Sequence, residues 1–183
     1  MQETDLSTIQ IRLYKPDDFF GELCCWRLES PYSHSSIMVD NYVYSAVYPR
    51  AVKMLSTDTK SPEYPELGIP PRKGMFVSFR VTEEKKELIK GWLEKHLGVR
   101  YDLLSLLGWA LRCQALQEKG TYYCFEFVHA SLVAAGLLPV ERSFITAEQL
   151  LLDLYENKII PTLSNEIIRR AKTQKHAPIR FKK

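Results

Sequence analysis

Short stretches of alternating apolar and polar residues mark the first half of the chain, and such alternation is typical of half-buried strands. The clearest is 75–81, and the proline-rich stretch before it, 56–74, predicts a long irregular loop. Asp40-Asn41 lies between two further stretches and predicts a hairpin with a two-residue turn. The predicted strands are residues 8–14, 33–39, 42–47, 51–55 and 75–81.

Apolar positions three and four residues apart replace this alternation after residue 82 and predict helices. An earlier helix opens at Pro16 with Asp17 and Asp18 in its first turn, where carboxylates complement the helix dipole. The helix after Thr82 is expected to bury Leu88. Strands that come first and helices that come later predict an α+β fold. The predicted helices are residues 16–28, 82–98, 102–111, 124–135, 146–154 and a short last one from Ser164 or Asn165.

The composition is that of one globular domain, since 45% of the 183 residues are apolar and 11% aromatic. A net charge of +3 is too small to indicate specific nucleic-acid recognition. The charge is uneven, because residues 169–183 hold seven lysines and arginines and no acid. We therefore expect one domain over 1–168 and a basic tail over 169–183. The tail is expected to be solvated, with contact to a virion or an anionic polymer as the alternative.

Nothing in the chain predicts export, a membrane span or a bound metal. Residues 1–5 are acidic and polar, so we expect no signal peptide and synthesis in a cytoplasm. The longest apolar stretch, 127–140, is too short to span a bilayer. The four cysteines fit a reducing cytosol rather than a disulfide scaffold. No paired cysteine or histidine spacing predicts a metal site, and we expect no cofactor.

The stretch 122–130 points to chemistry, because it delivers Cys124 onto the first turn of an apolar helix. The first backbone N–H groups of a helix have no partner within it, and the helix dipole there favours negative charge. A cysteine at this point is expected to be held as a thiolate, the form that attacks carbonyl carbon. Such a nucleophile needs a base, and four histidines compete for that role.

His34 is the histidine best placed to be that base. His129 lies five residues after Cys124 on the same helix and points to the opposite side. His96 is interpreted as a structural cation near a helix end, and His176 belongs to the basic tail. His34 instead starts an apolar strand among small serines, a place that packing does not explain. A lone strand histidine is nonetheless more often structural than catalytic.

The register of the hairpin determines which side chain can orient the imidazole of His34. With Asp40-Asn41 as a two-residue loop, Ser36 faces Ser45, and His34 shares their face of the sheet with Ser45 diagonal to it. A three-residue loop would bring Tyr44 to that face instead. Ser45 is therefore the expected third residue of the site, and Tyr44 is its alternative.

Four motifs occur in one order along the chain. They are Tyr32-Ser33-His34-Ser35-Ser36-Ile37, Val43-Tyr44-Ser45-Ala46, Gly98-Val99-Arg100-Tyr101-Asp102 and Tyr123-Cys124-Phe125-Glu126-Phe127-Val128. With histidine before cysteine, the chain resembles the circularly permuted branch of the NlpC-type papain-like cysteine hydrolases over roughly residues 8–140. The narrower resemblance is to proteins of tailed bacteriophages and prophages.

The resemblance implies a small antiparallel sheet or barrel packed against a helical layer that carries the nucleophile. It also implies that Cys124 attacks an amide in a peptide or in a peptidoglycan stem, while His34 takes the proton and Ser45 orients the imidazole. Ser45 departs from the Glu or His that is common in the family, and a hydroxyl orients an imidazole less strongly than a carboxylate. Phe125 likewise replaces the family's usual serine.

Several neighbours of the motifs are assigned supporting roles. The backbone N–H groups of Cys124 and Phe125 are the expected oxyanion donors. Glu126 is expected to pack or to pair with a basic side chain, and Asp102 to cap a helix. The candidate phenol donors, which the sequence does not rank, are Tyr32, Tyr101 and Tyr123.

Two other functions stay open. The same Cys–His site supports acyl transfer and lipid ester or thioester hydrolysis in related families. A phage virion or tail component with weak or no activity is the second alternative, since it would explain the weak third residue and would use the basic tail for docking. If the protein is phage-encoded, we expect it in the host cytoplasm or in the virion.

Overall fold

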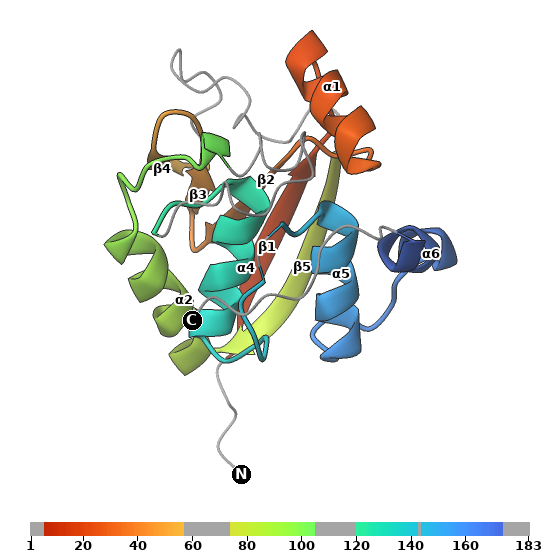
Figure 1. Ribbon diagram of the computed structural model, residues 1–183. Helices are drawn as coiled ribbons and strands as arrows, with labels where there is room; N and C mark the ends of the chain where they lie inside the picture. Colours follow the sequence, from red (N-terminus) through yellow and green to blue (C-terminus); the bar gives the residue numbers. More distant parts are fainter. Residues whose placement is uncertain (1–5, 57–73, 105–119, 143, 174–183) are drawn as a thin grey trace.

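The computed structural model of the protein describes residues 6–56, 74–104, 120–142 and 144–173. Within these residues it is a mixed α/β fold with a five-stranded antiparallel sheet and five helices (Figure 1). The strand order is β4-β3-β2-β1-β5, so the first strand lies inside the sheet. The strands are β1 (Leu6–Tyr14), β2 (His34–Val39), β3 (Tyr42–Ala46), β4 (Ala51–Leu55) and β5 (Gly74–Thr82). The helices are α1 (Phe19–Leu28), α2 (Glu83–Lys95), α4 (Cys124–Ala134), α5 (Ala147–Glu156) and α6 (Asn165–Thr173).

The α+β prediction is confirmed, and so is the predicted hairpin between β2 and β3. Val39 pairs with Tyr42 across Asp40-Asn41, which makes the loop two residues long. Asp40 adopts a positive φ of 54°, as such tight turns require. The same register continues to Ile37, which pairs with Tyr44.

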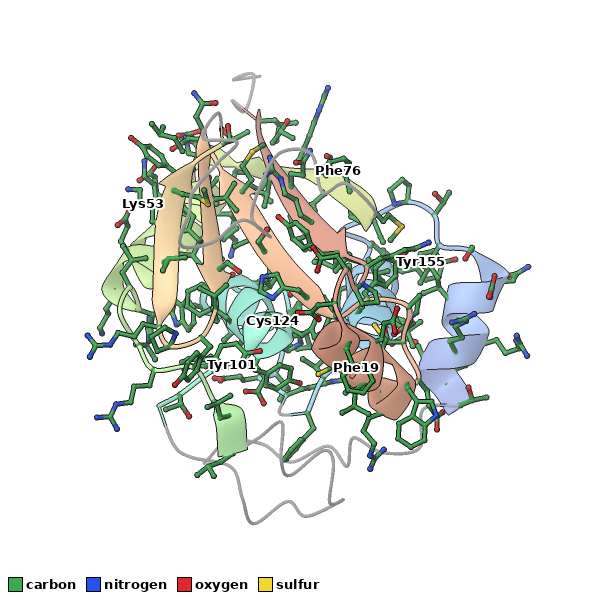
Figure 2. The ribbon with its side chains drawn as sticks, turned by 90° about the horizontal axis from the view of Figure 1, so that it is seen from above. Phe19, Lys53, Phe76, Tyr101, Cys124 and Tyr155 are labelled. Carbon is green, nitrogen blue, oxygen red and sulfur yellow. The ribbon has the colours of Figure 1, made fainter. Side chains whose placement is uncertain are left out.

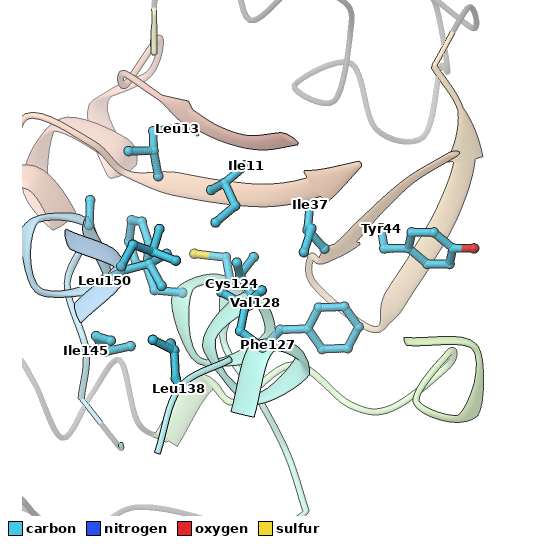
Figure 3. Close-up of a cluster of buried hydrophobic side chains, with 14 of the residues drawn as sticks. Ile11, Leu13, Ile37, Tyr44, Cys124, Phe127, Val128, Leu138, Ile145 and Leu150 are labelled. Carbon is cyan, nitrogen blue, oxygen red and sulfur yellow. The ribbon is translucent and has the colours of Figure 1, made fainter. Parts of the chain in front are cut away.

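The helix α4 is the centre of the helical layer. Figure 1 shows it in front of the sheet, with α2 on one side and α5 on the other. Every residue from Cys124 to Leu132 is buried, which explains why most side chains of this helix are apolar. Ile11 of β1 and Ile37 of β2, both fully buried, point from the sheet toward it (Figure 3).

Two predictions about helices were wrong in detail. The helix α1 begins at Phe19 rather than at Pro16, because the side chain of Asp18 caps it and accepts a hydrogen bond of 2.6 Å from the N–H of Gly21. Leu88 of α2 is 45% exposed. The buried stripe of α2 consists of Ile89 and Leu93, one helical turn apart, so Leu88 points away from the core.

The two C-terminal helices begin at residues that the sequence predicted as caps. Thr146 and Gln149 form a capping box at the start of α5. Ser164 rather than Asn165 caps α6, because its hydroxyl accepts a hydrogen bond of 3.3 Å from the N–H of Ile167. The helix runs on to Thr173, so the first residues of the basic segment are helical.

Three predictions fall wholly or partly outside the described residues: most of the loop 56–74, most of the helix 102–111, and the tail after Thr173, which includes His176. No helix in the described ranges is both long enough and apolar enough to cross a membrane.

Candidate active site

Cys124 is the first residue of α4, and its sulfur lies against the start of β2. The thiol donates a hydrogen bond of 3.9 Å to the backbone oxygen of Ser33. The backbone N–H groups of Ser35 and Phe125 and the hydroxyl of Tyr101 also lie close enough to the sulfur to favour its charged form. Figure 2 shows Cys124 and Tyr101 on the same side of the molecule. Four groups therefore surround the sulfur, and two of them belong to Ser33 and Ser35, the residues on either side of His34.

The expectation that Cys124 is held as a thiolate is wrong for the resting protein. The residue is only 2% exposed, and burial raises the pKa of its thiol from 9.0 to about 12. The N–H groups of Ser35 and Phe125 and the Tyr101 hydroxyl act in the opposite direction on this pKa, but the loss of water outweighs them. Cys124 is thus a neutral thiol at neutral pH, surrounded by donors that favour charge on the sulfur once it forms.

Ser45 stands behind His34, as the two-residue loop predicted. The His34 Nε2 atom lies 2.7 Å from the Ser45 hydroxyl, and that hydroxyl donates its proton to the backbone oxygen of Ser35 at 3.2 Å. With that proton on the Ser35 oxygen, Ser45 accepts from Nε2–H, because a hydroxyl has one proton. This bond assigns the neutral tautomer of His34 in which Nδ1 carries the free lone pair.

The surroundings of His34 keep the imidazole neutral. The ring is half-buried and tilted against the ring of Tyr14, with 5.4 Å between their centroids. The Tyr14 hydroxyl bonds the Ser36 hydroxyl at 2.9 Å. Burial lowers the pKa of His34 from 6.5 to about 4, since the neighbours Tyr14 and Ser45 bring no charge. His34 therefore has the protonation state that a general base needs at neutral pH.

The sulfur of Cys124 and the imidazole of His34 share no hydrogen bond in the part of the chain that the structure describes. The sulfur instead contacts backbone groups of Ser33 and Ser35, the residues on either side of His34. Successive side chains of a strand point to opposite faces of the sheet. Ser35 and Ile37 accordingly share the face toward α4, while His34 and its bonded neighbours share the other.

Tyr44, the alternative third residue, is bonded elsewhere. Its hydroxyl donates a hydrogen bond of 2.7 Å to Glu94 of α2. Tyr44 also pairs with Ile37 in the sheet, which places it on the face opposite to His34. The structure therefore brings Ser45, and not Tyr44, to the imidazole.

The structure also ranks the three candidate phenols. The Tyr123 hydroxyl donates to the backbone oxygen of Ile145 at 2.6 Å, and the Tyr32 hydroxyl contacts the sulfur of Met75 at 3.8 Å. Both roles are structural. Tyr101 is the phenol that reaches Cys124, and burial raises the pKa of its hydroxyl well above the ordinary value. Its proton is therefore retained, and Tyr101 is a permanent donor beside the sulfur.

The remaining polar candidates have structural partners, as predicted for His96. His129 bonds Asp153 of α5 at 3.2 Å, with both side chains buried. His96 stacks on Trp92 at a centroid distance of 3.9 Å. Glu126 accepts a hydrogen bond of 3.0 Å from the backbone N–H of Phe144, which has a positive φ of 56°.

Sequence reasoning missed three residues of this site. Ser33 and Ser35 act through their backbones, which no side-chain motif reveals. Tyr14 faces His34 in the register between β1 and β2, a pairing that requires the sheet order to be known. Among the described residues, no three histidine, cysteine or acidic side chains lie close enough together to hold a metal ion.

Compared with known proteins, the chain matches no family model and no curated protein sequence. The geometry of Cys124, His34 and their neighbours is therefore the basis for the proposed function.

Proposed function

We propose that the protein is a cysteine hydrolase that cleaves an amide bond, with Cys124 as nucleophile and His34 as general base. One observation supports the proposal. The sulfur of Cys124, the first residue of α4, contacts backbone groups of the residues before and after His34, and the His34 Nε2 atom is hydrogen-bonded to the buried hydroxyl of Ser45. The order of these residues resembles that of the permuted NlpC-type papain-like hydrolases, and we include that fold family in the proposal.

The reaction starts from a neutral pair. As the sulfur of Cys124 attacks the carbonyl carbon, the thiol proton moves to Nδ1 of His34, which later donates it to the leaving amine. Ser45 accepts from Nε2–H throughout and keeps the ring in this tautomer. Water then hydrolyses the thioester, with His34 again as base. The products are a carboxylic acid, an amine and the regenerated thiol.

Hydrogen-bond donors stabilise the charge that develops in these steps. The N–H groups of Ser35 and Phe125 point at the sulfur and favour the nascent thiolate. For the oxygen of the tetrahedral intermediate, we propose the backbone N–H groups of Cys124 and Phe125 as donors, with the Tyr101 hydroxyl beside the sulfur as a further donor. Donors of this kind contribute most where water is excluded, and Cys124 is buried.

Substrate binding has to bring the imidazole and the sulfur into direct contact. Catalytic hydrogen bonds are often long or poorly aligned in free enzymes and tighten only in the complex. In the free protein the His34 side chain lies on the face of the sheet opposite to the sulfur, so we expect the start of β2, whose backbone already contacts the sulfur, to rearrange when substrate binds. The proposed substrate is a peptide or a peptidoglycan stem peptide.

Hydrolysis of defined substrates tests the proposal. Peptidoglycan fragments, short peptides and acyl esters are incubated with the wild-type protein, the Cys124→Ala variant and the control Cys25→Ala, which removes a half-buried thiol from α1. Release of new amino groups by the wild type and Cys25→Ala, and not by Cys124→Ala, supports the amidase. Turnover of esters alone contradicts it.

A second candidate, acyl transfer or lipid ester hydrolysis, is favoured by one feature of α1. Phe19, Leu23 and Trp26 recur at helical spacing on one side of it and are 81%, 46% and 75% exposed. Cys24 of the same helix lies within electrostatic range of Cys124. An exposed aromatic face beside a nucleophile fits a lipid surface. In that case the substitutions Phe19→Ser and Trp26→Ser should slow the hydrolysis of esters held in vesicles and should leave the hydrolysis rate of soluble esters unchanged.

The non-enzymatic alternative is a virion or tail component that retains the fold. The neutral hydroxyl behind His34 and the raised pKa of Cys124 both favour weak activity. In that case the basic residues 169–183 would serve as a docking segment. The alternative predicts that no ester or amide acylates Cys124.

A further inference from the structure

Arg50 and Arg100 face each other in a short antiparallel bridge that borders the candidate active site. Two backbone hydrogen bonds flank this pair, one of 2.9 Å from Ala51 to Val99 and one of 3.0 Å from Tyr101 to Pro49. The two arginines are therefore a pair that is not itself hydrogen-bonded. In such a pair the Cα atoms are only about 4.5 Å apart, and both side chains lie on the same face.

This bridge brings two positive charges together at the surface. Both arginines are exposed, and in the part of the chain that the structure describes neither forms a hydrogen bond or an ion pair through its side chain. Like charges directly opposite each other on neighbouring strands destabilise the pairing. An uncharged polar residue would form the same backbone bridge without this repulsion. A bound anion would remove the repulsion, so the arginine pair has the properties of an anion-binding site that is open to solvent.

Tyr101 connects the arginine pair to the nucleophile. Its hydroxyl lies beside the Cys124 sulfur, and both residues lie on the same side of the molecule (Figure 2). Because successive side chains of an extended segment point in opposite directions, Arg100 points away from the sulfur while Tyr101 points toward it. A tyrosine and an arginine directed in this way span on the order of 10 to 13 Å by their covalent geometry. That distance corresponds to three or four residues of an extended peptide, which rises about 3.3 Å per residue.

We propose that Arg50 and Arg100 together bind a carboxylate of the substrate, three or four residues from the bond that Cys124 attacks. This inference rests on the proposed function, because it places the acidic group relative to the nucleophile. A carboxylate fits the pair, since its two oxygens can accept hydrogen bonds from two planar guanidinium groups at once. The expected substrates are peptides with an acidic side chain or a free terminal carboxylate at that distance from the cleaved bond.

Titration calorimetry measures the binding in a Cys124→Ser background, in which hydrolysis is suppressed. The probes are two N-acetylated, C-terminally amidated tetrapeptides, with three alanines followed by glutamate or by glutamine, and inorganic phosphate. At low salt we expect the glutamate peptide to bind about tenfold more tightly than the glutamine peptide, as a charge-assisted hydrogen bond provides. The preference should decrease as the ionic strength rises, because the arginine pair is exposed.

Substitutions of single arginines assign this preference to the pair. Arg50→Gln and Arg100→Gln should each remove most of it. Arg80→Gln, which removes an exposed arginine from β5, is the matched control and should keep it. Arg100→Lys retains the charge but lacks the planar fork, so it should keep only part of the preference.

Thermal unfolding of the free variants separates a ligand site from a structural role. Because the two charges repel each other, Arg50→Gln and Arg100→Gln should unfold at the same temperature as their parent or at a higher one. A lower unfolding temperature in both variants would overturn the proposal, since it would mean that the arginines stabilise the free protein.

Three binding results would also overturn the proposal. They are equal binding of the glutamate and glutamine peptides by the parent, a preference that Arg80→Gln reduces as much as the pair variants do, and tighter binding of phosphate than of the glutamate peptide. Failure of the proposed function looks different. In that case the wild type hydrolyses no substrate, yet the preference that depends on Arg50 and Arg100 is still observed in the Cys124→Ser protein.

Discussion

The imidazole of His34 bonds a neutral hydroxyl and lies partly out of water, and this makes the stability of the protein depend on pH. Burial lowers the pKa of His34 from 6.5 to about 4. Between these two values the unfolded chain binds a proton on this residue and the folded protein does not. The contribution of His34 to stability is therefore fully present above pH 6.5 and is lost as the pH falls toward 4.

The size of the effect follows from the shift in pKa. One pKa unit corresponds to about 1.4 kcal/mol, so the free energy of unfolding should fall by about 3 kcal/mol between neutral pH and pH 4. His34→Gln removes the titrating group, and this part of the pH dependence should vanish with it. Ser45→Ala leaves the imidazole buried, so this variant should retain the same pH dependence of the unfolding free energy.

Urea unfolding, followed by tryptophan fluorescence at a series of pH values, measures this difference. Other groups titrate over the same range, so the informative quantity is the difference in unfolding free energy between wild type and His34→Gln at each pH. We expect that difference to change by about 3 kcal/mol as the pH is lowered to 4. Parallel curves for the two proteins would refute the reasoning, because they would mean that the imidazole titrates alike in the folded and unfolded states.

Further predictions concern the residues around the proposed base and nucleophile. Ser45→Ala should lower kcat/KM about tenfold, because one hydrogen bond to His34 is lost, whereas Tyr44→Phe removes a neighbouring hydroxyl that bonds Glu94 and should leave kcat/KM within about twofold. Equal losses in the two variants would contradict the assignment of Ser45. Tyr101→Phe should slow alkylation of Cys124 by iodoacetamide at alkaline pH, because the phenol favours the thiolate, and should lower kcat about tenfold to a hundredfold. An unchanged alkylation rate would mean that the phenol does not act on the sulfur.

The β-hairpin was predictable in detail because two local signals agreed. The turn residues Asp40-Asn41 and the alternation on both sides of them specify a single register, and that register leads directly to the contact between His34 and Ser45. The start of α1 was less predictable, because Pro16 and Asp18 are both good helix-start signals. The helix begins after Asp18, because the side chain of Asp18 caps it.

The protonation state of Cys124 could not be predicted from the helix position alone. A helix N-terminus favours the thiolate, but burial against β2 and Tyr101 favours the thiol more strongly, and burial arises only from the tertiary structure. Tyr101 was one of three equivalent phenols in the sequence. Its pairing with Tyr122, directly before the nucleophile helix, places it beside the sulfur.

Arg12 illustrates the same limit. In the alternation of β1 it occupies a polar position, which predicts an exposed side chain. In the folded protein it is 2% exposed, and its Nε and Nη2 atoms contact the side chains of Gln10 and Met38. Strand periodicity distinguishes the two faces of a sheet but does not show whether the polar face is covered.

The central claim is that Cys124 becomes covalently acylated with the help of His34, and intact-protein mass spectrometry tests it most directly. The protein is mixed with an N-acetylated amino-acid ester and an amide at neutral pH and quenched at short times. We expect an acyl adduct on Cys124 in the wild type, none in Cys124→Ala, and slower formation of the adduct in His34→Gln. An adduct that forms equally fast without His34, or no adduct at all in the wild type, would contradict it.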